Sequence, residues 1–313
     1  MNDKVKFGLR IPAFPLDGTQ GTAFRDQIMD FAGALEGTYD SLWVADHLVP
    51  WFTKIDITAD TYEAMTTLTY LAAAFPQYKV GSIVLSQSYR PPALLAKMAA
   101  ILQNLSGGRF ILGIGAGWKE DEYLAYGYEY PDTVTRILQM EEAVKIIRQM
   151  WTQPKTTFHG EYYHVEEAIC EPKPDPAPPI LIGGGGRKYT LRIAAEQADW
   201  WNFPGGTVEN YAELLEVLRG HCENVGRDYD KIVKSWAVEV VAVAATHDAA
   251  VEMAQRSPLY DPETAIVGTP EEVYTQLKRF TDLGVSYFQM RFADFPKTDA
   301  GELFTKEVMP MFG

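Results

Sequence analysis

Short apolar segments alternate with longer amphipathic segments along nearly the whole chain. One unit shows the pattern clearly: apolar residues recur at helical spacing over residues 93–105, and a short apolar run follows at 109–114. Pro91 and Pro92 precede the helical stretch, where proline suits the first turn, and the glycines at 107–108 end it. The apolar run leads into the sequence GAGW at 115–118. This unit predicts a helix followed by a buried strand with a ligand at its end.

Repetition of this pattern predicts eight strands that alternate with helices. The alternation is typical of a parallel sheet, and eight units in 313 residues predict a closed (β/α)8 TIM barrel with insertions, formed as one domain over residues 1–313. An open doubly wound sheet is the alternative, but the first strand lacks a GxGxxG turn. The predicted strands are 5–11, 41–45, 79–85, 109–114, 179–182, 198–203, 232–244 and 285–292, and the predicted helices are 22–35, 61–75, 93–105, 132–151, 188–197, 208–225 and 270–283.

Two segments interrupt the alternation between the fourth and fifth strands. Residues 156–165 contain aromatic residues and a turn at His159-Gly160, which predicts a small hairpin. Residues 171–179 read EPKPDPAPP, which is too rich in proline for a helix or a central strand. This segment is either an interdomain linker or a stiff loop. Its brevity and the strand that follows it favour a loop within one domain.

Composition and charge limit the class of protein and its partners. The hydrophobic share is 47% and the charged share 22%, which is ordinary for globular proteins. No stretch approaches the roughly 20 apolar residues of a membrane helix, and the N-terminus has no apolar core of signal-peptide length, so we expect a cytoplasmic protein. A net charge of −14 argues against nucleic-acid partners. Cys170 and Cys222 are expected to be free thiols, and without CxxC or HExxH motifs we expect no metal site.

In a parallel barrel the active site lies at the carboxyl ends of the strands, so the residues after each strand are the candidates. Asp46 and His47 follow the second strand. A carboxylate beside an imidazole can hold the edge of a cofactor and move a proton, or the two residues can simply cap a loop and a turn. Trp51 and Phe52 nearby favour a pocket for a flat ligand. Ser86 follows the third strand, where its hydroxyl either bonds to a ring heteroatom or belongs to a polar turn.

Glycines follow the fourth and fifth strands. Gly115 and Gly117, together with Trp118, are candidates for close contact with a ligand because glycine lets the backbone approach it. The acidic residues at 120–122 begin the next helix, where the helix dipole explains them. After the fifth strand, backbone N–H groups and a helix N-terminus predict a mononucleotide phosphate site. That site consists of Gly183, Gly184, Gly185 and Gly186.

Charged and polar residues at the last strands are candidates for contact with a substrate. Trp201 and Asn202 lie at the end of the sixth strand, and Arg291 lies at the end of the eighth. Arg291 either touches a ligand or pairs with a carboxylate of the barrel wall. Glu239, a charge within the seventh strand, faces either a substrate or an arginine. An apolar or planar substrate is suggested by the aromatic residues Trp51, Phe52, Trp118 and Trp201.

In this order, the motifs resemble the bacterial luciferase-like superfamily and, within it, the oxidoreductases that use the deazaflavin coenzyme F420. The resemblance covers nearly the whole chain, and the motifs are more specific for the superfamily than for the cofactor. The matching residues are Trp43-Val44-Ala45-Asp46-His47, Tyr89-Arg90, Pro92-Ala93, Ala96-Lys97, Ser106-Gly107-Gly108-Arg109-Phe110, Leu112-Gly113-Ile114-Gly115-Ala116-Gly117-Trp118, Ile182-Gly183-Gly184-Gly185-Gly186, Arg136 with Glu141-Glu142, and Gly160-Glu161-Tyr162-Tyr163.

The resemblance implies a barrel with a long insertion and a flavin or deazaflavin over the strand ends. It implies a cis peptide bond between Ile83 and Val84 behind the cofactor ring. In the deazaflavin branch, the carboxylate matching Asp46 contacts the ring, and the histidine matching His47 serves as the acid/base. The glycine run at 183–186 binds the cofactor phosphate, and a homodimer is the family expectation.

Two cofactors stay open on this resemblance. Flavin monooxygenases of the superfamily often carry an arginine just after the fourth strand for the phosphate, and the GAGW sequence here has none, which favours F420. Arg136, with Arg187 and Lys188, could instead serve FMN.

Three hypotheses about function follow. The first is an oxidoreductase that transfers hydride between F420 and a small organic substrate. The second is an FMN-dependent monooxygenase that uses O2 and reduced flavin from a separate reductase. The third is a non-catalytic flavin-binding barrel.

Overall fold

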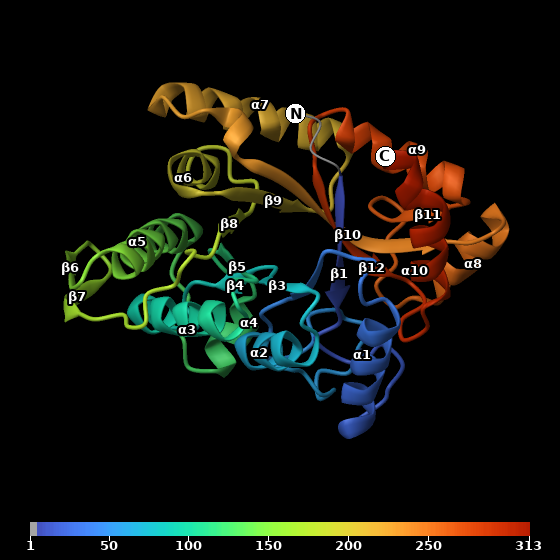
Figure 1. Ribbon diagram of the computed structural model, residues 1–313, viewed down its shortest axis with the longest axis horizontal. Helices are drawn as coiled ribbons and strands as arrows, with labels where there is room; N and C mark the ends of the chain where they lie inside the picture. Colours follow the sequence, from blue (N-terminus) through green and yellow to red (C-terminus); the bar gives the residue numbers. More distant parts are fainter. Residues whose placement is uncertain (1–4) are drawn as a thin grey trace.

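The computed structural model describes residues 5–313 and contains a closed ring of eight parallel strands (Figure 1). The ring closes because β12 pairs with β1, with Lys6 opposite Tyr287. This closure confirms the predicted barrel, and the open-sheet alternative is wrong. Residues 1–4, which the one-domain prediction included, lie outside the described residues. Around the ring the strands are β1 (Lys6–Ile11), β2 (Ser41–Val44), β3 (Lys79–Ser82), β5 (Phe110–Gly115), β8 (Ile180–Gly183), β9 (Trp200–Pro204), β10 (Val233–Val243) and β12 (Tyr287–Phe292).

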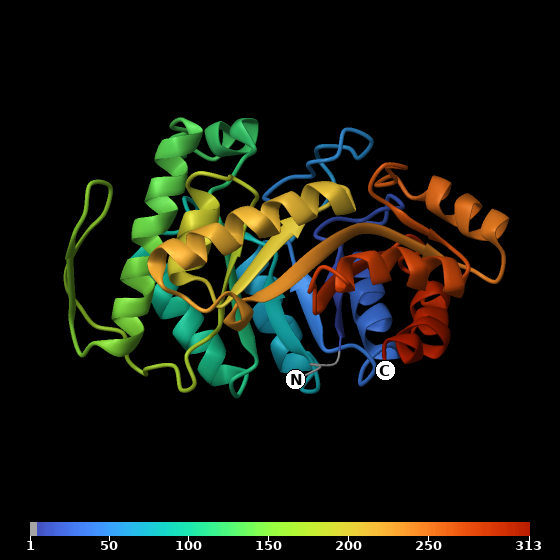
Figure 2. The same ribbon diagram turned by 90° about the horizontal axis from the view of Figure 1, so that it is seen from above.

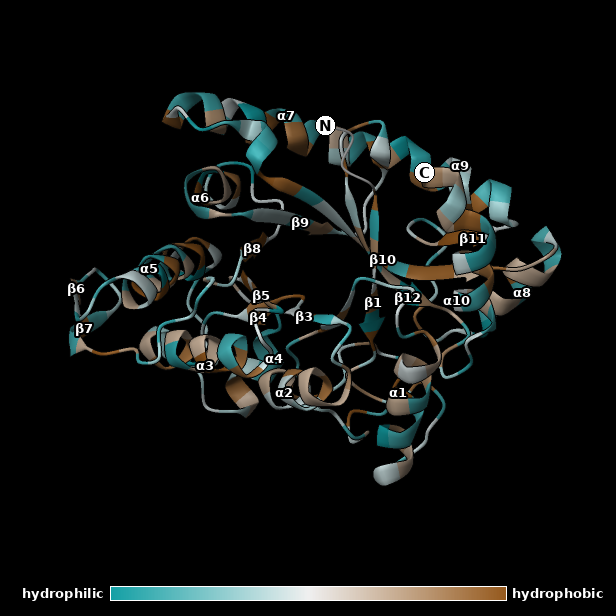
Figure 3. Cartoon of the chain, viewed as in Figure 1, coloured by the Kyte–Doolittle hydropathy of each residue, from teal (hydrophilic) through white to brown (hydrophobic). Residues whose placement is uncertain are grey.

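Helices surround the ring and cover its outer face (Figures 1 and 3). β2, β5 and β12 are buried along their whole length, so most of their residues are apolar, and the polar residues Gln289 and Arg291 of β12 are buried as well. Hydrophilic residues lie on the outward sides of helices such as α7 (Figure 3). The covering helices are α1 (Thr22–Ala34), α2 (Ala64–Ala74), α3 (Pro92–Leu105), α5 (Thr133–Thr152), α6 (Thr190–Gln197), α7 (Val208–Val225) and α9 (Pro270–Thr281).

Capping residues decide where two of these helices begin. The Glu63 carboxylate accepts two backbone N–H groups of the first turn of α2, so this helix begins at Ala64 and not at the predicted residue 61. In α9, Thr269 and Glu272 form a reciprocal capping box, and Pro270 occupies the first turn.

A long insertion lies between β5 and β8. It contains α4 (Glu120–Ala125), α5 and the predicted hairpin, whose strands β6 (Thr156–His159) and β7 (His164–Ala168) lie at the edge of the molecule beside α5 (Figure 2). The proline-rich segment then returns along the barrel, where Gln103 Nε2 donates to Pro176 O at 2.8 Å. Lys173 Nζ donates to Met150 O at 2.9 Å. The segment is therefore a loop held against α3 and α5.

A second insertion, between β10 and β12, was not expected from the sequence. It contains α8 (His247–Arg256) and β11 (Ile266–Gly268), which pairs with the last residues of β10 beyond the ring. A strand of three residues is too short to produce a recognisable alternation. After β12 the chain ends in α10 (Asp299–Leu303), a π-helical turn (Phe304–Val308) and a 3-10 turn (Met309–Phe312).

The third strand is divided into β3 and β4 (Leu85–Ser86) where a single strand was predicted. A cis peptide bond between Ile83 and Val84 separates the two parts, which confirms the expectation from the family resemblance. Inside the barrel, Trp43, Ile111 and Leu181 belong to an apolar cluster and are at most 2% exposed. Because this cluster fills the interior, space for a ligand remains at the carboxyl ends of the strands.

The cysteines and the helices bear on two expectations from composition. Cys170 and Cys222 are both free and buried, as predicted. Within residues 5–313, none of the helices combines the length and the apolar character that crossing a membrane requires.

Candidate active site

A cavity of about 580 Å³ opens at the carboxyl ends of the barrel strands. This volume lies in the usual range of small-molecule and cofactor sites. Its walls come from strands β1, β4, β5, β8, β9 and β10 and from the segments that follow several of them, so distant parts of the chain meet there. Most of the predicted site residues line it: Asp46, His47, Trp51, Ile83, Val84, Ser86, Gly115, Gly117, Trp118, Gly183, Gly184, Gly186 and Asn202.

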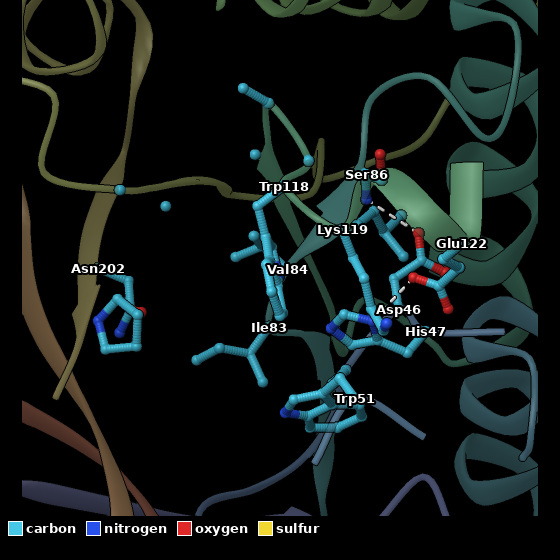
Figure 4. A pocket seen from close by; sticks show the side chains of 18 of the residues that line it. Asp46, His47, Trp51, Ile83, Val84, Ser86, Trp118, Lys119, Glu122 and Asn202 are labelled. Carbon is cyan, nitrogen blue, oxygen red and sulfur yellow. Dashed lines mark hydrogen bonds and ion pairs between the residues drawn. The ribbon is translucent and has the colours of Figure 1, made fainter. Parts of the chain in front are cut away.

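The His47 imidazole lies at one side of the cavity between two tryptophans (Figure 4). It stacks on Trp51 with ring centroids 4.1 Å apart, and its edge meets Trp118 at 5.6 Å. Its Nδ1 lies 2.9 Å from Oε2 of Glu122. Within the described chain Nε2 has no hydrogen-bond partner. Nδ1 therefore fixes the ring, while Nε2 is the atom that can exchange a proton with a bound ligand.

Glu122 lines the cavity and bonds to His47, but it was not among the site residues predicted from the sequence. Its carboxylate is buried and accepts hydrogen bonds from Tyr89 Oη at 2.9 Å, from the Val49 amide at 3.0 Å and from the Leu48 amide, besides its contact with His47. Burial raises the pKa of Glu122, but the hydrogen bonds from His47 and the amides outweigh burial and hold this pKa below its ordinary value. The helix dipole, which the sequence analysis invoked for this residue, is not a sufficient explanation.

Asp46 connects the loop after β2 to the segment after β4. Both of its oxygens accept from the Arg90 guanidinium at 2.9 Å, and Oδ2 also accepts from the Ser86 amide at 2.9 Å. Arg90 pairs with Glu63 as well, so the ion pair extends to the start of α2. Burial lowers the pKa of Arg90, but the two carboxylates outweigh it and raise the pKa above its ordinary value. Asp46 lines the cavity with most of its acceptor capacity already used.

The wall formed by Ile83 and Val84 is closely packed against glycines, which leave room for the Val84 side chain. A Cβ atom on Gly115 would lie 2.7 Å from Val84 Cγ2, and one on Gly183 would lie 2.9 Å from Val84 Cγ1. Gly117 has a φ of +76°, and a Cβ there would lie 2.7 Å from Ser86 Oγ. Glycine is therefore required at these three positions by close packing, and at Gly117 by its positive φ as well.

The glycine run after β8 leads into the N-terminus of α6. Gly184 has a φ of +123°, and its amide donates to Asn202 O at 3.0 Å. No side chain of the described residues caps the first turn of α6, and Thr190 of that turn lines the cavity. Open N–H groups at a helix N-terminus attract an anion. The residues present thus fit the phosphate of a flavin or deazaflavin.

Two of the predicted site residues, Trp201 and Gly185, do not line the cavity. Successive residues of a strand face opposite sides, so Asn202 lines the cavity while Trp201 faces α7. Trp201 is fully buried there, and its Nε1 donates to Gly184 O at 2.9 Å. A Cβ on Gly185 would lie 2.6 Å from the Phe203 ring, so this glycine packs against the outer core. Neither residue lines the cavity.

The three cations considered for an FMN phosphate, Arg136, Arg187 and Lys188, also lie outside the cavity lining. The Arg136 guanidinium is buried on α5, stacks over the Tyr130 ring at 3.9 Å and donates to Pro131 O. Arg187 is exposed and pairs with Glu213 at 2.5 Å. Neither guanidinium is available to the cavity in this arrangement.

Three charged residues from neighbouring strands form a buried ion-pair cluster. Arg10 Nη1 lies 3.0 Å from Glu239 Oε1, and Arg291 Nη1 lies 3.0 Å from Glu239 Oε2. Arg10 and Glu239 line the cavity, whereas Arg291 does not. Of the two alternatives predicted for Arg291, the structure therefore shows the ion pair with a carboxylate of the barrel wall and not contact with a ligand. Burial raises the pKa of Glu239, but the two arginines outweigh it and hold this pKa below its ordinary value. Arg10 was not among the predicted residues, although its charge within an apolar strand was a usable signal.

Sequence comparison agrees with this geometry. The family described as "Luciferase-like monooxygenase" matches residues 5–263. The chain belongs to this luciferase-like family. One relative, the F420-dependent glucose-6-phosphate dehydrogenase of Kineococcus radiotolerans, is 34% identical over 218 residues, which cover 68% of this chain and 63% of that protein. The protein of the same name from Amycolatopsis mediterranei is 24% identical over 91% of this chain and 94% of its own length.

The luciferase-like relatives include both cofactor classes. The FMNH(2)-dependent dimethylsulfone monooxygenase of Pseudomonas fluorescens is 26% identical over 80% of this chain and 78% of its own length. Among solved structures, an F420-dependent secondary alcohol dehydrogenase in complex with an F420-acetone adduct superimposes with a TM-score of 0.83. It is 21% identical and covers 99% of this chain and 100% of its own, which shows that the two proteins share the fold.

Proposed function

We propose that this luciferase-like protein transfers hydride between coenzyme F420 and a small organic substrate, with His47 as the residue that takes up or releases the accompanying proton. The observation that carries the proposal is the His47–Glu122 pair. Glu122 holds Nδ1 at 2.9 Å and leaves Nε2 free in the cavity that Ile83 and Val84 also line. F420-dependent dehydrogenases and FMN-dependent monooxygenases among the relatives support an F420- or flavin-dependent oxidoreductase.

Two regions of the cavity would bind different parts of the cofactor. The wall at Val84, Gly115 and Gly183 would lie behind the cofactor ring, and the glycine run with the N-terminus of α6 would hold its phosphate. When bound, F420 supplies two-electron hydride chemistry and the protein supplies geometry. Asp46 keeps the segment after β4 in place through Arg90 and the Ser86 amide, and one remaining acceptor site of its carboxylate can meet a donor of the ring.

His47 would accept or donate the proton that accompanies hydride transfer at the reacting carbon of the substrate. In oxidation of an alcohol, Nε2 would accept the O–H proton of the substrate, and the bound cofactor would supply the hydride acceptor that the conversion to a carbonyl requires. In the reverse direction, Nε2 protonates the oxygen of the carbonyl. The buried Glu122 carboxylate stabilises the imidazolium and keeps Nδ1 protonated, so Nε2 is the basic atom in the neutral ring.

Reduced FMN with O2 is the second candidate function, because a monooxygenase that depends on FMNH(2) is among the relatives. That reading requires a separate reductase as partner. Arg136 and Arg187 are engaged elsewhere and do not line the cavity, so the side chains of this chain favour F420. A homodimer stays a prediction from the family resemblance.

Parallel titrations of the apoprotein with F420 and with FMN, followed by tryptophan fluorescence, test the proposal. Trp51 and Trp118 line the cavity, so a bound ring should quench their emission. The expected result is micromolar or tighter binding of F420 and weak binding of FMN. Trp201→Phe should preserve the quench, because Trp201 faces away from the cavity, whereas Trp118→Phe should reduce it. Preferential binding of FMN, with O2 consumption by reduced FMN and substrate, would replace the F420 reading with the monooxygenase.

The role of His47 needs a separate measurement. His47→Ala should lower turnover far more than affinity for F420, since the imidazole is assigned to proton transfer. An equal loss of turnover and of F420 affinity would contradict that role.

A further inference from the structure

The half of the cavity opposite the cofactor wall has its own chemistry. The wall and the glycine run come from β4, β5 and β8, whereas Arg10 and Glu239 come from β1 and β10 on the other side of the ring. Leu259 packs there with Trp51 and Phe52 in one apolar cluster. If the proposed cofactor lies against the wall formed by Ile83 and Val84, residues on this side contact a substrate. This inference therefore rests on the proposed function.

Within the ion-pair cluster, the carboxylate is the group that opens to the cavity. The Glu239 side chain is 25% exposed, whereas those of Arg10 and Arg291 are 6% and 4% exposed. Each Glu239 oxygen accepts one guanidinium N–H at 3.0 Å and keeps further acceptor capacity. A substrate that reaches this point meets an acceptor of hydrogen bonds that is more exposed than either of the two cations.

Among the described residues that line the cavity, each cation already has an acidic partner. Arg10 pairs with Glu239 at 3.0 Å, and Lys119 pairs with Asp121 at 2.5 Å. At the Arg10 side of the cavity, a phosphate or carboxylate on the substrate would therefore have to displace Glu239 from Arg10 or lie against the Glu239 carboxylate, and both are unfavourable. An ammonium group is also disfavoured, because the cluster of two arginines and one glutamate carries a net positive charge.

We infer that the substrate is an uncharged compound with an apolar body and a second hydroxyl group, besides the one on the reacting carbon, that donates a hydrogen bond to Glu239. Such a substrate satisfies the open acceptor and the apolar surface of Trp51, Phe52 and Leu259 together. This class differs from the sugar phosphate in the names of several relatives. Glu239 acts as a selectivity residue: it admits a neutral donor and shields the arginines from anions.

Two matched pairs of probes test the inference with the F420-bound enzyme. The pairs are trans-1,2-cyclohexanediol with trans-2-hydroxycyclohexanecarboxylate, and glucose with glucose 6-phosphate. We expect kcat/KM of the wild type for the diol to exceed that for the hydroxy acid by at least about tenfold, since a buried acceptor without its donor and a like charge are both penalised. Equal or better use of the hydroxy acid or of glucose 6-phosphate by the wild type would overturn the inference.

In the Glu239→Gln variant, we expect the preference for the diol over the carboxylate to be reversed. Arg10 and Arg291 also have an Nε–H without a partner within residues 5–313, so loss of the Glu239 charge leaves two poorly satisfied cations. Calorimetric titration with cyclohexanecarboxylate should show binding at least about tenfold tighter in this variant than in the wild type, and diol binding at least about tenfold weaker. Asp261→Asn, which removes a negative charge from an exposed residue of the same cavity, is the control and should leave carboxylate binding close to that of the wild type.

The outcomes separate this inference from the proposed function. If F420 does not bind, the proposed function fails, and the same titrations on the apoprotein still compare Glu239→Gln with the wild type. If F420 binds and the carboxylate binds equally to wild type and Glu239→Gln, the inference fails alone. If Glu239→Gln does not fold, the wild-type preference between the two members of each probe pair decides.

Discussion

Replacing Glu122 by glutamine should abolish most activity without removing the cofactor site. The change keeps the shape of the side chain, so the amide oxygen can still accept from the amides of Leu48 and Val49. The new NH2 group then faces His47 Nδ1, where an acceptor stood before. Nδ1 must become the acceptor, which moves the proton of the neutral ring to Nε2. His47 then presents a donor to the cavity where oxidation of an alcohol requires a base.

The expected loss in kcat is about 100- to 10,000-fold, or about 3–5 kcal/mol of activation free energy. The upper value is what the comparable change costs in a Ser-His-Asp triad, about 10,000-fold, where the wrong tautomer has the same effect. Loss of a charge-assisted hydrogen bond to the imidazolium, worth about 1.5–3 kcal/mol, sets the lower value. Glu122 is only 1% exposed, so solvent screening does not reduce these figures.

Turnover of F420 with the alcohol probe and affinity for F420 by tryptophan fluorescence measure the two effects separately. Glu120→Gln is the matched control because Glu120 is exposed in the same first turn of α4. It removes the same charge from the helix dipole, worth only about 0.3–1 kcal/mol, and should leave kcat nearly unchanged. If Glu122→Gln and Glu120→Gln lower kcat to a similar extent, or if Glu122→Gln retains more than a tenth of wild-type activity, the positioning role is refuted.

Two further predictions concern packing and pH. Gly115→Ala places a Cβ 2.7 Å from Val84 Cγ2, so we expect weaker F420 binding in the fluorescence titration and a loss of about 1–3 kcal/mol in the free energy of unfolding. Gly220→Ala, in α7 with no described atom near its Cβ outside the helix, should instead stabilise by about 0.5–1 kcal/mol and leave F420 binding unchanged. Burial raises the pKa of Asp294 to about 6, and its Oδ1 has no partner among the described residues, so the ionised form destabilises the fold. Since the folded pKa lies above the unfolded one, the proton-linked stability is complete below pH ~4 and is lost as pH rises through 6. Asp294→Asn should therefore raise the free energy of unfolding by about 1–2 kcal/mol at pH 8 and hardly at pH 4.5, as urea titrations would show; an equal gain at both pH values would contradict this account.

The barrel could be predicted because each of its strands carries a local signal. A strand buried on both faces is rich in apolar residues, and each of the eight predicted strands overlaps one of the ring strands. β11 has three residues and pairs with the end of β10 beyond the ring, so no pattern within the segment marks it. The start of α2 was misplaced because capping by Glu63 depends on side-chain geometry, which periodicity does not contain.

The site could be predicted only up to the residues that directly follow strands. Asp46 and His47 were found because the carboxyl end of β2 must face the cavity. Their partners were not found, since Arg90 and Glu122 lie 44 and 75 residues away along the chain and meet them only after the barrel has closed. These partners give the adjacent residues Asp46 and His47 different roles.

Asp46 uses most of its acceptor capacity on Arg90 and the Ser86 amide, so it serves mainly to fix the segment after β4. His47 is held at Nδ1 alone, so its Nε2 stays free for chemistry. Under the proposed function, the dipeptide motif therefore predicts where a proton can be transferred, whereas the buried residues behind it determine which atom transfers it.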